Sequence, residues 1–467
     1  MTTPKLEIEA RLSRQRFALK ERVALTISVA NRGSEMVNVP HPLHSTSLHL
    51  VLRAEDGSEQ VVTPGSVVRP GTVPQRVSPG VPPGRSWVED IDASAYLRLD
   101  RPAAYTLTLE YEWGEDRRWS SPPLPLVIAP PAGTALAVAP AEAGGLEPPR
   151  VLWVEREGER GRFLLWTGGE PELRGAVQVA EGSPDADPVM STTEPRKSWT
   201  ETWAAWVQGR ELYRTYFGQG LFAQLPAEKV RLEGIQPVRV VAPLLAEFSP
   251  SNRPRCTAGV LETKALHLVE LAPDGSAATR GKVALPGQPQ GAWATHHGKH
   301  GRVFAFALQS GEATAVAGVR APYGGAPGAV EPWLEAAGKF LGGDVRASSD
   351  GAQTFAGILA ARQQAWARLT FRAPEPGKQA EPSLAAVDLG AGAQLRCVRL
   401  DGNGQMHLLV VHAGALQYVP PGSATPTWSD ERLGRHARFV DLALRPGAPP
   451  ELIVYDDERG PAVLPLR

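Results

Sequence analysis

Cysteine is nearly absent from this chain of 467 residues, which contains only Cys256 and Cys397. So few cysteines in so long a chain exclude a disulfide scaffold and are typical of a reducing compartment. The two cysteines lie in separate apolar segments. We interpret both as small core residues rather than reactive thiols.

An excess of charge of either sign is also missing, because 49 basic residues face 50 acidic ones and leave a net charge of -1. Such a balance argues against nucleic acid and anionic membrane as partners. The segment Met1–Glu9 lacks a basic patch followed by an apolar run, and charges interrupt every long apolar stretch. We therefore expect a soluble, cytoplasmic protein.

The motifs of the common enzyme classes are absent as well. The chain has no glycine-rich phosphate loop, no Gly-x-Ser-x-Gly elbow, no His-Glu-x-x-His helix and no paired-cysteine zinc site. A distributed active site would leave no such trace. We assign no catalytic residue, no cofactor and no metal, and we expect that the protein is not an enzyme.

Glycine and proline, by contrast, are abundant, with 47 and 44 residues. Few apolar runs have helical spacing, so this composition predicts an all-β fold of many short strands joined by turns. In residues 1–130, Val23, Leu25, Ile27 and Val29 alternate with small or polar residues, as in a half-buried strand. Similar runs about every ten residues predict a β-sandwich of about seven strands.

Residues 131–149 are rich in alanine, proline and glycine and poor in large apolar side chains. This composition predicts a linker between two domains. One apolar run within the linker, Ala135–Ala139, is a candidate strand. The domain that follows the linker is built from sequence repeats, and the last of these, at the C-terminal end, is too short for four strands. We therefore expect the run Ala135–Ala139 to pair with this C-terminal repeat and so close the domain.

From residue 150 to residue 467, apolar runs recur at intervals of about 37 to 53 residues, which brackets the roughly 40 to 50 residues expected of one four-stranded propeller blade. Seven such repeats fit this length, and six or eight remain alternatives. We place the lead strand of each repeat near one residue of the following set: Val151, Trp203, Val240, Ala292, Val345, Leu395 and Phe439. The polar stretch 181–197 we interpret as an insertion between strands.

A polar turn between two apolar runs carries the clearest resemblance to known proteins. Its residues are Ser348, Asp350, Gly351, Thr354 and Phe355. They resemble the Asp-box hairpin of sialidase-type β-propellers, which reads Ser-x-Asp-Gly-Gly-x-Thr-Trp/Phe, with Ala352 in place of the second glycine. The same residues are similar to the Ser-Pro-Asp-Gly turn of TolB-like and WD-type blades. The resemblance implies a propeller and a structural role for the turn on its outer rim.

Two further resemblances concern residues 1–130. The strand entered through Arg101–Tyr105 resembles the penultimate strand of bacterial immunoglobulin-like domains. The segments Leu6–Ala10 and Phe17–Val23 resemble the small intracellular proteinase inhibitors of bacilli. Both imply a β-sandwich.

Candidate binding residues form an aromatic group in a chain that is otherwise only 7% aromatic. They are Trp199, Trp203, Trp206, Tyr213 and Tyr216. Tryptophans contribute large contact areas with a polar N–H, so this group is suited to a binding surface or to stacking on sugars. Packing in the core of a blade is the competing interpretation, and we favour it.

Two polar patterns resemble metal sites, and we assign neither to a metal. Asp401–Gln405 begins like a calcium loop but lacks the later bidentate carboxylate, so a tight hairpin turn is expected. His296, His297 and His300 have no nearby acidic or cysteine ligand, which favours a solvated loop. The same interpretation applies to His41, His44 and His49.

Architecture and missing motifs together favour a non-catalytic recognition or scaffold subunit of a cytoplasmic complex, whose partners are one or more proteins. The bias toward alanine, arginine, proline and glycine is typical of a GC-rich bacterial genome. A carbohydrate-active propeller, either sialidase-like or lectin-like, is one alternative. A protease inhibitor or protease substrate, based on residues 1–130, is another.

Overall fold

The computed structural model describes residues 6–41, 46–66, 80–112, 118–139, 149–167, 175–196, 199–217, 224–230, 232, 234–248, 254–272, 274, 276–296, 301–347, 352–360, 366–445 and 447–466. The chain divides into two compact units. The first comprises Met1–Pro131, Glu170–Val177 and Glu458–Gly460. The second comprises Ala132–Gly169, Gln178–Asp457 and Pro461–Arg467. No helix among the described residues is long and apolar enough to span a membrane.

The first unit consists of two sheets and a short ribbon. One sheet has the order β1 (Leu6–Leu12), β3 (Ala24–Asn31), β8 (Ser86–Asp92). The other has the order β2 (Arg16–Ala18), β11 (Leu124–Ala129), β9 (Ala103–Glu112), β5 (Leu48–Ala54), β6 (Glu59–Val62), and β10 (Arg118–Ser120) also pairs with β9. The ribbon joins β4 (Val37–Asn38) to β7 (Gly80–Val81), and two 3₁₀ turns are η1 (Pro64–Ser66) and η2 (Ala93–Ala95).

One apolar core holds the first unit together. Alternate residues of β3, namely Leu25, Ile27 and Val29, are almost completely buried, and Leu107 and Leu109 of β9 meet them from the other sheet. Successive side chains of a strand point to opposite faces, so this alternation places one apolar face of each sheet inside. The first unit is therefore a β-sandwich.

The second unit is a succession of antiparallel sheets, most of them of four strands in chain order. The first two are β12 (Gly133–Val138), β13 (Arg150–Glu157), β14 (Arg160–Thr167), β15 (Val177–Gly182) and β16 (Val189–Arg196), β17 (Trp199–Gln208), β18 (Glu211–Phe217), β19 (Gln224–Val230). Next come β20 (Arg239–Phe248), β21 (Pro254–Glu262), β22 (Ala265–Leu271), β23 (Ala277–Ala284) and β24 (Pro289–His296), β25 (Arg302–Ser310), β26 (Ala313–Ala321), β27 (Val330–Ala337).

The remaining sheets follow the same plan. They are β28 (Lys339–Ala347), β29 (Gln353–Ala360), β30 (Trp366–Arg372), β31 (Ser383–Val387) and β32 (Gln394–Leu400), β33 (Met406–His412), β34 (Ala415–Val419), β35 (Trp428–Asp430). The helix α1 (Glu431–His436) leads to the last sheet, β36 (Ala437–Ala443), β37 (Glu451–Asp456), β38 (Gly460–Pro465).

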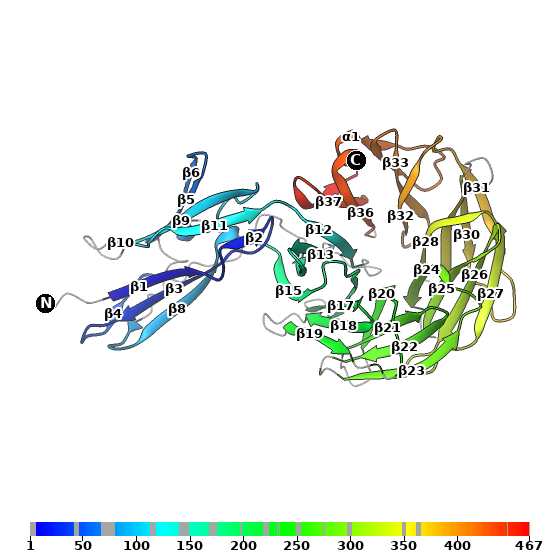
Figure 1. Cartoon of the computed structure of the whole chain (residues 1–467), viewed down its shortest axis with the longest axis horizontal. Coiled ribbons are helices and arrows are strands. Elements are labelled where there is room, and N and C mark those ends of the chain that lie inside the picture. Colours follow the sequence, from blue (N-terminus) through cyan, green and yellow to red (C-terminus); the bar gives the residue numbers. More distant parts are fainter. Residues whose placement is uncertain are drawn as a thin grey trace. The chain divides into compact units, whose positions relative to one another are not determined.

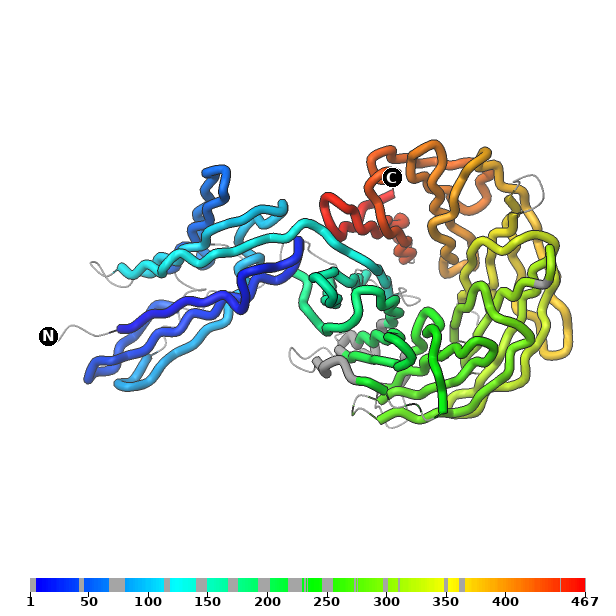
Figure 2. The backbone as a smooth tube through the Cα atoms, viewed as in Figure 1, coloured from blue at the N-terminus to red at the C-terminus, as the bar shows by residue number. Residues whose placement is uncertain are grey.

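The first strands of these sheets lie beside one another in chain order, from β12 through β16, β20, β24, β28 and β32 to β36, and β36 lies beside β12. Figures 1 and 2 show the sheets following one another around a centre. The expected all-β fold, a β-sandwich followed by a β-propeller, is confirmed. Because one pair, Ala242 with Trp293, joins β20 to β24 in a single larger sheet, the count of seven blades stays a prediction.

Apolar side chains fill the space between each sheet and the next in chain order. Trp206 of β17, for example, packs on Phe163 of β14, with the two ring centroids 4.3 Å apart, and both side chains are completely buried. Comparable clusters join every later sheet to its successor as far as the last sheet. Among the described residues, no such cluster joins the last sheet, β36–β38, to the first, β12–β15.

A buried polar contact joins those two sheets instead. Tyr455 of β37 donates a hydrogen bond to Oε1 of Glu155 in β13 and accepts one from the backbone N–H of Gly133 in β12, at 2.8 Å. Tyr455 and Glu155 are 0% and 3% exposed. A Cβ on Gly133 would lie 2.4 Å from the Tyr455 ring, so only glycine fits there. We call Gly133, Glu155 and Tyr455 the closing latch.

Further hydrogen bonds hold both sides of the closing latch. The carboxylate of Glu155 also accepts from the indole N–H of Trp153, at 3.1 Å, and from the backbone N–H of Ala132, at 2.8 Å. Arg438 of β36 donates to the carbonyl of Gly133 at 2.6 Å. Every hydrogen-bonding atom that the latch buries therefore has a partner, as burial away from water requires.

The expected pairing of the run Ala135–Ala139 with the C-terminal repeat is wrong. The run Ala135–Ala139 does contain a strand, β12, but β12 pairs with β13 in the first sheet and not with the C-terminal repeat. The last sheet has three described strands and borrows none. The side chains of Tyr455 and Arg438, rather than backbone pairing between strands, connect the last sheet to the first.

Two of the predicted lead strands are also corrected. Val151 and Trp203 lie in β13 and β17, the second strands of their sheets, whereas the first strands are β12 and β16. Strand β16 occupies much of the polar stretch that we interpreted as an insertion. Small or polar residues dominate both first strands, so their hydrophobic pattern is weak.

Candidate functional site

The aromatic candidates are distributed through the core. Trp203 and Trp206 are completely buried in β17, and Tyr216 in β18 is 6% exposed. Trp203 packs on Tyr216, with ring centroids 4.6 Å apart, while Tyr213 is half-buried and stacks parallel to Trp206. The side chain of Trp199 lies outside the described residues. Trp203 and Trp206 therefore pack between sheets and offer no surface to a ligand.

The sialidase-like alternative needs a tyrosine and an arginine cluster at the mouth of the central channel. Tyr213 and Tyr216 instead belong to β18, the third strand of its sheet, whereas the described strands that neighbour one another around the ring are the first strands. The described residues do not bring either tyrosine to that centre.

The turn that resembles an Asp box lies between β28 and β29. Ser348, Asp350 and Gly351 lie outside the described residues. Thr354 and Phe355 belong to β29, and Phe355 is completely buried beside Phe371 of β30, with ring centroids 5.1 Å apart. Phe355 is a core residue of this sheet.

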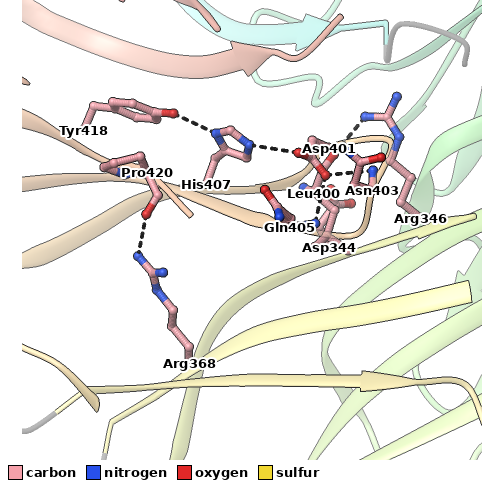
Figure 3. A network of polar contacts seen from close by, with 10 residues as sticks. All are labelled: Asp344, Arg346, Arg368, Leu400, Asp401, Asn403, Gln405, His407, Tyr418 and Pro420. Carbon is pink, nitrogen blue, oxygen red and sulfur yellow. Dashed lines mark hydrogen bonds and ion pairs between the residues drawn. The ribbon is translucent and has the colours of Figure 1, made fainter. Parts of the chain in front are cut away.

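The corresponding turn of the following sheet, Asp401–Gln405, is described in full and forms the hairpin that the sequence predicts. Oδ1 of Asp401 accepts hydrogen bonds from the backbone N–H groups of Asn403 and Gln405, both at 2.8 Å (Figure 3). Gly404 has a φ of +75°, which glycine adopts without strain. The carboxylate that resembled a calcium ligand is used to fix the turn.

A polar network extends from this turn into the sheet, as Figure 3 shows. Oδ2 of Asp401 lies 3.6 Å from Nε2 of His407, and Nδ1 of His407 lies 2.7 Å from the hydroxyl of Tyr418. Burial lowers the pKa of His407, and burial together with the Asp401 charge raises the pKa of Tyr418 to about 12. At neutral pH both groups are therefore uncharged, and the phenol is held as a hydrogen-bonding group rather than as a nucleophile.

The same network includes Asp344 of β28, which ties this sheet to the next. Oδ1 of Asp344 accepts from the backbone N–H of Val345, and Oδ2 accepts from that of Leu400 in β32, both at 2.9 Å. In return, Arg346 donates to the carbonyl of Leu400 at 2.8 Å. Burial raises the pKa of Asp344. The two side chains bind one strand end of the neighbouring sheet.

An equivalent arrangement joins β32 to β36. Oδ1 of Asp441 accepts from the backbone N–H of Leu442 at 2.7 Å and from the thiol of Cys397 at 3.2 Å. Oδ2 of Asp441 pairs with Arg399 at 2.6 Å. Burial, with the neighbouring Asp441 charge, raises the pKa of Cys397 well above its usual range. A raised pKa keeps this thiol protonated, and a protonated thiol is a poor nucleophile because the thiolate is the reactive form.

The described residues do not form a metal site. No group of three or more His, Cys, Asp or Glu residues that could hold a metal ion occurs in the described part of the chain. His41 lies 3.8 Å from Glu89, His49 contacts Thr63, and His44, His297 and His300 lie outside the described residues. The site that emerges is a set of buried polar contacts between propeller sheets.

Sequence reasoning did not find Asp344, Asp441, Glu155 or Tyr455. A signal existed for the two aspartates, because each is the one carboxylate in a strand with several apolar residues, and a buried charge requires a partner. Nothing local marks the closing latch, whose members Glu155 and Tyr455 are 300 residues apart in the chain.

Comparisons with known proteins add little to this picture. No family model matches the chain, and no curated protein matches it. Among solved structures, a protein from Lactobacillus plantarum is similar with a TM-score of 0.38 and 12% identity, over 82% of this chain and 96% of that chain. Puromycin hydrolase is similar with a TM-score of 0.40 and 13% identity, over 72% of this chain and 51% of the hydrolase. At such scores the fold assignment rests on the sheets of the chain itself.

Proposed function

We propose that this protein is a non-catalytic recognition or scaffold subunit that binds one or more proteins in a bacterial cytoplasmic complex. The observation that supports this proposal is that burial makes the thiols and phenols inside the protein less reactive. Burial raises the pKa of both thiols, Cys256 and Cys397, and of the buried phenols of Tyr418 and Tyr455. Catalytic nucleophiles need the opposite shift.

The architecture is suited to recognition. Each propeller sheet is joined to its neighbours by apolar clusters or by buried hydrogen bonds, so the ring is a rigid support for the loops and edges at its surface. Binding to a preorganised surface avoids the cost of ordering it.

For the first unit we propose an immunoglobulin-like sandwich. Its support is Tyr105, at the start of β9, whose hydroxyl donates to the carbonyl of Arg101 at 3.1 Å. Immunoglobulin-like domains use a tyrosine near the start of the penultimate strand in this way. For the second unit we propose seven blades, each beginning with one of the first strands that surround the centre.

The proposed function is tested by cross-linking the tagged full-length protein in the organism that encodes it and quantifying what is purified with it. We expect at least one protein at a near-stoichiometric ratio, absent from a control that expresses the tag alone. Recovery of the chain without any stoichiometric partner would contradict the proposal.

A further inference from the structure

Within the part of the chain that the structure describes, the outermost strand of each propeller sheet pairs on one side, and its other side leaves backbone N–H and C=O groups available for pairing. Natural proteins protect such edges with charged residues or proline. The protected outermost strands contain at least one of these: Glu181 in β15, Pro226 in β19, Arg280 in β23, Pro332 in β27, Asp430 in β35 and Pro461 in β38.

Strand β31 is the exception among these described outer strands. Its sequence is Ser383-Leu-Ala-Ala-Val387, without a charge or a proline. Its first four residues are exposed, and Leu384 keeps 59% of its surface accessible. Strand β31 pairs with β30 from Thr370↔Ser383 to Trp366↔Val387, and no described strand covers its other side (Figure 1). An exposed, uncharged edge of this kind is a template for one more strand.

Charges at both ends of β31 indicate what that strand is. Glu381 precedes the strand and Asp388 follows it, and both are exposed. Within the described part of the chain, no ion pair includes either carboxylate. An added antiparallel strand with a basic residue at each end places opposite charges together, which favours the pairing.

The same charges disfavour a second copy of this chain as the occupant. Antiparallel self-pairing of β31 about Ala385 would set Asp388 opposite Pro382 of the second copy, which has no N–H to donate. It would also gather the acidic ends of both strands, Glu381 and Asp388, at the pairing without a basic residue to offset them, and a juxtaposition of like charges disfavours a partner.

We infer that β31 is the docking edge for an extended segment of a partner protein, a short β-forming stretch with a lysine or arginine at each end. This inference rests on the proposed recognition function. Main-chain hydrogen bonds to β31 supply the binding, and the end charges supply the selectivity.

The probe is a fluorescent peptide of sequence Lys-Ser-Val-Thr-Val-Thr-Ser-Lys, titrated with the full-length protein and followed by anisotropy. Its acidic counterpart has glutamate at both ends. Each of the two exposed ion pairs should strengthen binding by about two- to threefold, so we expect the basic peptide to bind roughly 5- to 10-fold more tightly.

Three variants make the test specific to the edge. Leu384→Lys places a charge within β31 and should abolish binding, whereas Val238→Lys, at a valine that is 60% exposed elsewhere, should leave it unchanged. The double variant Glu381→Lys with Asp388→Lys should reverse the preference in favour of the acidic peptide. Thermal melting and circular dichroism establish that each variant is folded.

Three results would overturn the inference: no saturable binding of either peptide to the folded protein, equal binding by the Leu384→Lys variant, or a dimer of the wild type that Leu384→Lys dissociates. The proposed function is tested separately. If Leu384→Lys still recovers the partners that the wild type recovers in cells, the docking edge is wrong and the recognition function stands. If neither form recovers a stoichiometric partner, the recognition function fails even where the peptide binds.

Discussion

The junction that closes the propeller differs from the junctions that precede it along the chain. Between the first and second sheets, Trp206 packs on Phe163 in a continuous apolar cluster. Between the last and first sheets, Tyr455 is hydrogen-bonded to Glu155 and Gly133. Apolar packing is tolerant of the exact partner, whereas a buried polar contact works only when every group is satisfied. Among the described residues the closing junction has such a contact without an apolar cluster beside it, so we expect its pairing to be more specific than that of the first junction.

The largest effect is expected at an apolar junction. Trp206→Ala removes a completely buried indole that packs against Phe163, and it leaves a cavity between the first two sheets. We expect a loss of roughly 3–5 kcal/mol in the free energy of unfolding, measured by denaturant titration. A loss below about 1 kcal/mol would show that this junction is not held by the tryptophan.

A smaller loss is expected at the closing latch. Tyr455→Phe keeps the ring but removes the hydroxyl, so the N–H of Gly133 loses its acceptor and Glu155 loses a donor. Leaving buried polar groups unsatisfied costs about 1–3 kcal/mol, again measured by denaturant titration. An unchanged free energy of unfolding would contradict a stabilising role for the latch.

The two kinds of junction should also differ in their response to pH. Burial raises the pKa of Glu155 in the folded state. The folded protein therefore holds this proton more firmly than the unfolded chain, so the stability from Glu155 is complete below the ordinary carboxyl range of about 4 to 5 and is lost as the pH rises through the folded pKa.

The comparison between wild type and Glu155→Gln isolates this contribution. As the pH is raised from about 4 to about 9, the melting temperature of the wild type should fall relative to that of the variant, which cannot ionise at this position. If the melting temperatures of the two proteins instead change with pH by the same amount across this range, the Glu155 carboxyl has no raised pKa in the folded state.

The smallest effect is expected from Tyr418→Phe, which makes the same chemical change as Tyr455→Phe within a single sheet. Among the described residues, the Tyr418 hydroxyl contacts Nδ1 of His407, whereas the Tyr455 hydroxyl contacts both Glu155 and Gly133. We expect a loss of about 0.5–1.5 kcal/mol in the free energy of unfolding. A loss equal to or greater than that of Tyr455→Phe would remove the distinction between the closing latch and other buried hydroxyls.

The sequence predicts the elements best where local signals agree. The strands β32, β33 and β34 are the clearest case, because their apolar runs are separated by turns at Gly404 and Gly414, both of which have positive φ. The strands β12 and β16 were misplaced, because small and polar side chains hide their hydrophobic pattern.

The candidate site was less predictable than the fold. The turn at Asp401 was found because side-chain capping of a turn is local in sequence. The closing latch and the contact between Asp344 and Leu400 depend on which sheets become neighbours, and this is decided by the whole ring. One sequence carries no signal for such pairs.

A double-mutant cycle between Tyr455→Phe and Glu155→Gln tests most directly whether buried polar side chains close the ring. The free energies of unfolding of the wild type, both single variants and the double variant give the coupling between the two residues, and a matched cycle combines Tyr455→Phe with Glu262→Gln in another sheet. We expect a coupling of roughly 1–2 kcal/mol for Tyr455 with Glu155 and additivity within about 0.5 kcal/mol for the matched cycle. Additive losses in both cycles would contradict closure by the latch.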